Sequence, residues 1–225
     1  KMKKRKGIKK LLIITICIIV IFIVQTSPVV FQKPLGSKSM IDENIVLYYQ
    51  KGDEPGATEV FELLQEKAES IRTQMNFESD TPTNVYLYKT QWQLAIREAG
   101  FATLIIAPSW YIGDSHNGNI MMVSPYTEVK SHTHDSILNA TLHELVHSIM
   151  YQINPDISYF WDNGLATYLS GQTPESDMLN SMPIPSLDDT HTDNGLKFGE
   201  MGGYAFSYNY IEYLNQTYGW DLIVD

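Results

Sequence analysis

The stretch His143-Glu144-Leu145-Val146-His147 decides the interpretation of this chain, because it lies inside an amphipathic pattern that covers residues 135–152. Apolar side chains recur there every three or four residues, which predicts a helix with one buried face. Asp135 or Ser136 is placed to cap its N-terminus, and Pro155 follows its end. Residues four apart on a helix lie one turn above each other, so we expect both imidazoles on one side.

Two imidazoles with a neighbouring carboxylate are typical of a hydrolytic zinc site. We predict that His143 and His147 bind Zn²⁺, for which imidazole nitrogen at about 2.0–2.1 Å is a common ligand. Glu144 is predicted to be the general base that deprotonates a metal-bound water, whose pKa zinc lowers towards about 7. The metal-bound hydroxide then attacks a peptide carbonyl, so the motif predicts zinc-dependent hydrolysis of peptide bonds. The alternative, two surface histidines on a solvated helix, fits poorly with the apolar stripe opposite them.

A second stretch, Phe160-Trp161-Asp162-Asn163-Gly164-Leu165-Ala166-Thr167-Tyr168, resembles the second motif of the gluzincins, the thermolysin-like clan in its broad sense. Many bacterial members read aromatic-x-x-Glu-Gly-x-Ala there, and that Glu is the third zinc ligand. The resemblance covers about residues 85–220. It implies an α+β, zincin-like fold in which a small mixed sheet packs on the HExxH helix. It also implies a peptide or protein substrate that pairs with an edge strand, for which residues 120–124 are our candidate.

The chain departs from this family at the ligand position, which Asn163 occupies in place of Glu. An amide oxygen is a weaker zinc ligand than a carboxylate, and the side chain is one methylene shorter. Asp162 is the chemical substitute, although it is turned by about 100° on a helix and Asp at a helix start is often an N-cap. Both remain predicted metal ligands. More distant candidates are Glu175, His191 and Glu200.

The missing Glu also leaves a second function open. A relative that has lost its third ligand would be a non-catalytic, zincin-like binding or regulatory module. For the enzyme, similar gluzincins often place a Tyr or His downstream to stabilise the tetrahedral oxyanion, and Tyr204 is the candidate here. With fourteen tyrosines in the chain, packing is its alternative role. His132 and His134 form a His-x-His before the helix, and there a polar loop is favoured over a second metal site.

The first 27 residues are typical of a membrane-targeting segment, either a signal peptide or an uncleaved anchor. Seven lysines and arginines precede an apolar run over residues 11–24. This run is short for a membrane span, which needs roughly 20 residues. The positive-inside rule places the rest of the chain outward, at the extracellular face of the membrane or secreted. We predict a stalk over residues 28–56 and the zincin-like domain over residues 57–225.

The net charge of the outward part limits the kinds of partner that it can bind. The chain has 16 basic and 26 acidic residues, and without the seven basic residues of the leader its net charge is about −17. This charge opposes binding to nucleic acid and to anionic lipid. Cys17 is the only cysteine and lies in the apolar run, so no disulfide can form within the outward part.

The remaining elements follow from apolar spacing and from turn residues. Residues 103–107 and 120–124 are two apolar runs joined by a polar stretch with Asn117-Gly118, which predicts a hairpin or two neighbouring strands. A long surface loop is predicted over residues 172–194. The other predicted helices are residues 57–75, 92–99, 162–169 and 203–217, and the other predicted strands are residues 45–49 and 85–88.

Overall fold

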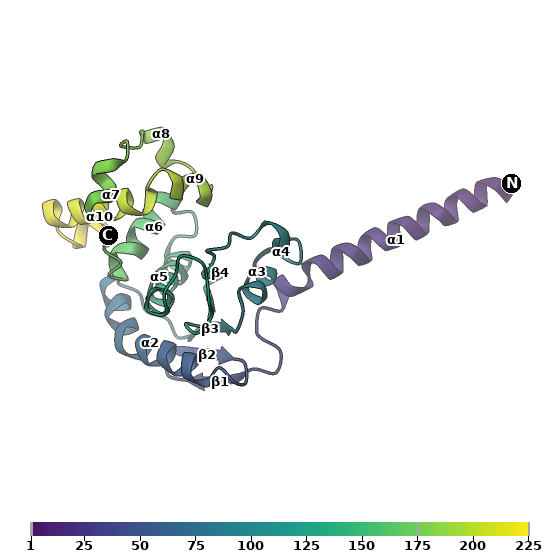
Figure 1. Ribbon diagram of the computed structural model, residues 1–225, viewed down its shortest axis with the longest axis horizontal. Coiled ribbons are helices and arrows are strands. Elements are labelled where there is room, and N and C mark those ends of the chain that lie inside the picture. The colour runs from purple at the N-terminus through teal and green to yellow at the C-terminus, as the bar shows by residue number, and fades with distance from the viewer. Residues whose placement is uncertain (1, 175, 225) are drawn as a thin grey trace.

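A mixed five-stranded sheet with surrounding helices makes up the body of the protein, and one long helix, α1 (Met2–Val30), projects from it (Figure 1). The computed structural model describes residues 2–174 and 176–224, without the side chains of residues 2–8, 106 and 176–178. This arrangement confirms the predicted α+β class with a small mixed sheet.

The sheet has a parallel centre and antiparallel edges. Its strands are β1 (Lys38–Ile41), β2 (Ile45–Tyr49), β3 (Thr83–Tyr88), β4 (Gly113–His116) and β5 (Asn119–Val123). Their order is β1-β2-β3-β5-β4, in which β2, β3 and β5 run parallel. The predicted strands 45–49 and 85–88 are confirmed. The segment 28–56, which we predicted as a stalk, contributes β1 and β2 to the sheet.

The hairpin around Asn117-Gly118 is present, but its first arm differs from the prediction. Positive φ angles of 52° at Asn117 and 74° at Gly118 form the tight turn between β4 and β5. Residues 103–107 form no strand and instead contain the short helix α4 (Thr103–Ile106). Consequently β4 is the edge strand, and our assignment of the edge to residues 120–124 is wrong, because β5 pairs on both sides.

Most predicted helices are found close to their expected bounds. They are α2 (Glu54–Gln74), α3 (Gln91–Ala99), α5 (His134–Ile153), α6 (Tyr159–Leu169) and α10 (Gly203–Tyr218). Helix α5 is capped by Thr133 in a capping box with Ser136, rather than by Asp135 or Ser136 itself. The predicted loop 172–194 contains short helices. These and the remaining ones are α7 (Ser176–Ser181), α8 (Leu187–Thr190), α9 (Gly195–Glu200) and α11 (Asp221–Val224).

Two packing contacts position the later helices. Helix α5 packs against α2 and against β4 and β5 of the sheet, with Ile137, Leu145 and Ile149 fully buried in the core. Helix α6 crosses α10 closely at Gly164, where an added Cβ would stand 3.0 Å from the Ser207 carbonyl oxygen. A larger residue there would separate the two helices, so this glycine holds α6 and α10 together over α5.

Helix α1 is long and apolar enough to cross a membrane, by length and composition, over Lys9–Val30. The apolar side chains of residues 11–24 are exposed in the structure. A helix of this kind near the N-terminus is compatible with a signal sequence and with a membrane anchor.

Candidate functional site

Helix α5 brings His143, Glu144 and His147 to one cleft, as their spacing predicts. The centroids of the two imidazole rings lie 4.7 Å apart, and the ring planes cross at 78°. All three side chains line a cavity of about 590 Å³. His143 and Glu144 are buried, while the opposite face of α5 packs into the core. The three groups are therefore fixed on one rigid element that opens to a shared space.

The cleft is lined by several separate parts of the chain. They are helix α5, the edge strand β4 with the residues before it, the loop 154–157, the start of α6, residues 194–196 and the start of α10. Besides α5, these parts contribute Trp110, Tyr111, Gly113, Asp114, Tyr159, Asp162, Asn163 and Tyr204 to the lining. Both predicted metal ligands on α6 and the predicted tyrosine therefore lie in the same cleft as the HExxH motif.

Each imidazole turns its Nδ1 atom towards an oxygen atom outside α5. His143 Nδ1 donates a hydrogen bond of 3.0 Å to Gln172 Oε1. His147 Nδ1 lies 2.8 Å from Asp162 Oδ2, which is an ion-pair distance without the alignment of a hydrogen bond. Among the described residues, neither Nε2 atom takes part in a hydrogen bond or an ion pair. Outer partners of this kind orient metal-binding histidines, and they leave Nε2 for the metal.

Asp162 lies in the first turn of α6 but does not cap it. Ser158 is the N-cap, and its hydroxyl accepts a hydrogen bond from the Trp161 backbone N–H. Asp162 instead lies against His147, and its Oδ1 atom is buried without a hydrogen-bond partner in the described structure. A buried carboxylate oxygen with no partner is costly, so this side chain is poised for a further donor or a cation.

Asn163 is almost fully buried and lines the cleft. Its Nδ2 atom donates a hydrogen bond of 2.8 Å to the backbone carbonyl of Tyr159, one turn earlier on α6. Because the amide nitrogen has this partner, the oxygen Oδ1 is the atom that remains to serve a ligand.

Tyr204 and Tyr159 form a pair at the end of the cleft near α10. The Tyr204 ring centroid lies 6.3 Å from that of His143. Burial raises the pKa of Tyr204, and its contact with Tyr159 raises it further. Burial also raises the pKa of Tyr159, partly offset by its contacts with Tyr204 and Asn163. Both hydroxyls therefore stay protonated and are able to donate hydrogen bonds. Our sequence reasoning named Tyr204 and missed Tyr159, which had no signal beyond its position at the start of α6.

The edge strand β4 supplies two residues that the sequence did not point to. Gly113 lies against Glu144, and an added Cβ would stand 3.2 Å from Glu144 Oε1 and collide with the Met122 sulfur. Asp114 follows it in the cleft wall. Burial raises the pKa of Asp114 well above its ordinary value, and the charges of Glu144 and Glu98 raise it further. These groups lie in a polar stretch without periodicity, which is why sequence patterns gave no sign of them.

Burial also sets the protonation of the α5 cluster. It raises the pKa of Glu144 to about 7, partly offset by the charge of His147. Burial lowers the pKa of His143 well below its ordinary value, with a further lowering from His147. For His147 burial is the largest single influence and lowers the pKa, but the contact with Asp162 and the charges of Asp162, Glu144 and Asp114 together outweigh it, so the pKa is raised. At least His143 is thus held as a neutral imidazole, the form that binds metals.

The more distant candidates do not join this group. Glu175 lies outside the described residues, and His191 and Glu200 are exposed and do not line the cleft. Within the described residues no set of three His, Cys, Asp or Glu side chains is arranged as a ready metal site. His143, His147, Asp162 and Asn163 do line one cleft. Two imidazoles with an amide or carboxylate oxygen form a donor set that fits a zinc ion with two strong ligands and a further oxygen ligand.

Comparison with protein-family models and with curated proteins finds no match to this chain.

Proposed function

We propose that this protein is a zinc-dependent peptidase of the HExxH type, with His143 and His147 as metal ligands. The observation that carries the proposal is the orientation of the two imidazoles. Their Nδ1 atoms are engaged by Gln172 and Asp162, while the same cleft contains Glu144 on the same helix. Such outer partners are expected around metal-binding histidines.

Bound zinc would supply a Lewis acid for the substrate carbonyl and would lower the pKa of a water molecule. Glu144 would accept the proton from that water, since its carboxylate lies in the cleft beside both histidines. Tyr204, paired with Tyr159, would donate a hydrogen bond to the oxygen of the tetrahedral species. The chain thus provides a base and oxyanion donors on different walls of one cavity.

The edge strand β4 supports a peptide as the substrate. It pairs with β5 on one side only. The hydrogen bond from the Val123 N–H to the Ile112 carbonyl sets the alternation along the pair, so the backbone groups of Gly113 point away from β5 and are free for an extended chain. Gly113 lies directly against Glu144. A peptide that adds to this edge would therefore pass the base at close range.

We further propose that Asn163 is the third, weak ligand and that Asp162 orients His147 from outside the metal. The Nδ2 atom of Asn163 is already used in a hydrogen bond, so Oδ1 is the atom of this side chain that is available to bind the metal. Asp162 already contacts His147 Nδ1 at 2.8 Å, the place where an orienting carboxylate belongs.

Asn163 is also the observation that favours the second candidate function, a non-catalytic module with a zincin-like fold. Without a carboxylate ligand the site holds zinc less tightly. In that case the cleft would bind an extended peptide along β4 and release it intact.

The zinc content of the purified protein tests the metal site, and together with an assay of peptide hydrolysis it distinguishes the two proposed functions. The full chain, purified in detergent and equilibrated with zinc, should hold one zinc ion per chain by elemental analysis, and His143→Ala should hold far less. His191→Ala, which removes an exposed histidine, is the matched control and should keep its zinc. Equal zinc in His143→Ala and in the control would overturn the metal site. Full zinc without peptide hydrolysis would establish the non-catalytic module.

A further inference from the structure

The end of α1 is joined firmly to the turn between α3 and α4. Gln25 Nε2 donates to the Ala99 carbonyl at 3.1 Å, and its Oε1 accepts from the Ala102 N–H at 3.0 Å. The Gln25 backbone carbonyl accepts from the Phe101 N–H at 3.3 Å. Gly100, with a φ of 86°, leaves space for that carbonyl, where any Cβ would collide. The turn is therefore held at the level of Gln25, directly after the exposed apolar residues 11–24.

This turn presents apolar side chains outward and buries a polar one. The Thr103 hydroxyl is buried and donates towards the carbonyls of Ala95 and Gly100. On the outer side, Phe101 is 42% exposed, Leu104 is 52% exposed and Ile105 is 89% exposed. Figure 1 shows α4 beside α3, close to where α1 leaves the body. A surface turn in water usually exposes polar side chains and buries apolar ones, whereas this turn does the opposite. It also lies next to α1, whose side chains are themselves apolar.

The length of α1 decides which of its residues reach the lipid. The apolar run over residues 11–24 spans about 21 Å at the helical rise of about 1.5 Å per residue, whereas the candidate span Lys9–Val30 has 22 residues and is about 33 Å long. The hydrocarbon core of a bilayer is about 30 Å thick. A helix that crosses it therefore uses residues beyond Val24, so Gln25 and the turn bonded to it lie at the boundary of the membrane.

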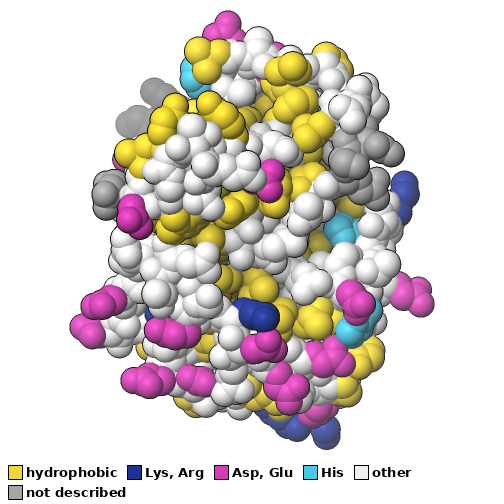
Figure 2. All heavy atoms as spheres, turned by 90° about the vertical axis from the view of Figure 1, so that its left-hand side faces the viewer, with side chains coloured by type: hydrophobic (Ala, Val, Ile, Leu, Met, Phe, Trp, Pro, Cys, Tyr) yellow, Lys and Arg dark blue, Asp and Glu magenta, His cyan; other side chains and the backbone are white. Residues whose placement is uncertain are grey.

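The distribution of charged residues agrees with a turn that lies close to the membrane. All 26 acidic residues of the chain follow residue 41, and residues 99–113 contain no charged residue of either sign. Both segments next to the membrane are thus free of acid. On the side of the molecule away from α1, acidic side chains are plentiful over the lower part, at the level of α2 and β1 in Figure 1 (Figure 2). The acidic surface thus lies away from α1, while the uncharged turn lies beside it.

We propose that residues 101–105 enter the outer interface of the bilayer beside the end of α1 and form a second membrane contact of this protein. The contact fixes how the body sits on the membrane. Pro108 and Trp110, which follow the turn directly, line the cleft described above. One wall of the cleft is consequently held close to the lipid surface.

The test uses the full chain at low density in vesicles of phosphatidylcholine, a lipid without net charge. In a Cys17→Ser background, Ile105→Cys carries a polarity-sensitive fluorophore. Ile184→Cys, at an isoleucine that is 85% exposed between α7 and α8, is the matched control. A label on the natural Cys17 reports whether α1 itself is in the lipid. Lipids with a nitroxide on the acyl chain then quench any label that lies within the bilayer.

The label at position 105 should emit at shorter wavelength than the label at position 184 and should lose intensity with nitroxide lipid, as the Cys17 label does. If only the Cys17 label is quenched, the turn lies in water and the proposal is overturned. If the Cys17 label is not quenched either, α1 does not insert and the proposal fails with it. A blue shift at position 105 that grows with protein density and resists nitroxide lipid would assign the turn to contacts between chains, which also overturns the proposal.

Discussion

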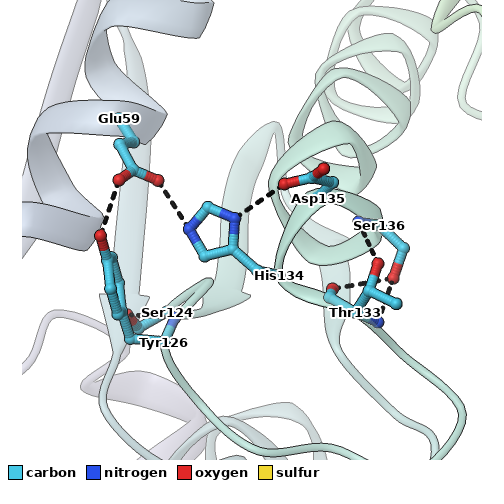
Figure 3. A network of polar contacts seen from close by, with 7 residues as sticks. All are labelled: Glu59, Ser124, Tyr126, Thr133, His134, Asp135 and Ser136. Carbon is cyan, nitrogen blue, oxygen red and sulfur yellow. Dashed lines mark hydrogen bonds and ion pairs between the residues drawn. The ribbon is translucent and has the colours of Figure 1, made fainter.

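Helix α5 carries two histidine clusters, and their difference explains why one of them suits a metal. At its N-terminus, His134 is in contact with two carboxylates and lies at the surface (Figure 3). Its Nε2 atom is 2.7 Å from Glu59 Oε2, and its Nδ1 atom is 2.9 Å from Asp135 Oδ1. Both ring nitrogens act as donors there, so no lone pair remains for a cation.

Nine residues later the same helix presents His143 and His147, which differ from His134 in the number of their partners. Each ring has one outer oxygen partner, at Nδ1, and the surroundings are buried rather than open. Burial disfavours the charged imidazole of His143, whereas the carboxylates around His134 favour the charged form. A histidine next to carboxylates is thus an ion pair in one cluster and a candidate ligand in the other. The number of partners and the access of water decide which.

The largest contrast is expected in catalysis. Glu144→Gln should lower the rate of peptide hydrolysis by about 10²–10⁴-fold, the usual contribution of a positioned general base. The matched control is Glu59→Gln, which removes the carboxylate that contacts His134 and Tyr126 and should leave the rate unchanged. The rate is measured as the release of new amino termini from a peptide mixture. Full activity in Glu144→Gln would remove this residue from the mechanism.

A smaller contrast is expected from the outer carboxylates. Asp162→Asn should weaken zinc binding by about 10–100-fold, because the orientation of His147 is then less well fixed. Asp135→Asn changes the equivalent partner of His134 and should not alter zinc affinity. Competition with a coloured zinc chelator gives both affinities. Equal affinities in the two variants would show that Asp162 does not support the metal site.

Asn163→Glu should raise the affinity of the cleft for zinc. The substitution removes the hydrogen bond from Nδ2 to the Tyr159 carbonyl, which costs about 1 kcal/mol of folding stability, and adds a buried charge. The metal-free variant should therefore unfold at a lower temperature than the unchanged chain. Zinc should raise its unfolding temperature by more than it does for the unchanged chain, because a carboxylate is the stronger ligand.

The isosteric change Asn163→Asp separates the effect of the carboxylate charge from the effect of side-chain length. It adds the carboxylate without the extra methylene, so its response to zinc should be smaller than that of Asn163→Glu if reach is what the chain lacks. Thermal unfolding with and without zinc measures each case. No response to zinc in either variant would show that position 163 does not face the metal.

The sequence was sufficient for elements whose pattern is local. The period of apolar residues located α5 and α2, and the histidine spacing placed the motif on one side of α5. The edge strand escaped this reasoning because Gly113, Asp114, Ser115 and His116 are all small or polar and show no alternation. Residues 103–107 misled it for the opposite reason. An apolar run resembles a buried strand, whereas here it is a short helix whose outer side chains stay exposed.

The surroundings of the histidines lay beyond sequence reasoning because they depend on distant contacts. Gln172 is 29 positions from His143, in a stretch predicted as loop, and no local pattern identifies it as a hydrogen-bond partner. Asp162 was named as a possible metal ligand or cap, and only the packing of α6 over α5 puts it against His147 Nδ1. Residue identity suggested which chemistry is available, whereas tertiary contacts determine which atom each side chain offers.

The smallest expected effect concerns the exposed cluster and its dependence on pH. The contact with Asp135 is the largest cause that raises the pKa of His134, and Glu59 from α2 adds to it, while Tyr126 packs edge-on against the ring. A raised pKa in the folded state means that the charged form stabilises folding below the unfolded pKa of about 6.5. This stabilisation is lost as the pH rises through the folded value.

His134→Asn should therefore lower the unfolding temperature more at about pH 6 than at about pH 8.5, because the stabilisation by the charged form is lost as the pH rises through the folded pKa. Because these pairs are open to solvent, the difference should amount to less than about 1 kcal/mol. High salt should reduce it further, since exposed ion pairs are screened. Unfolding curves of the two chains at both pH values measure the effect. A loss of stability that is larger at the higher pH would show that His134 contributes through neutral packing rather than through its carboxylates.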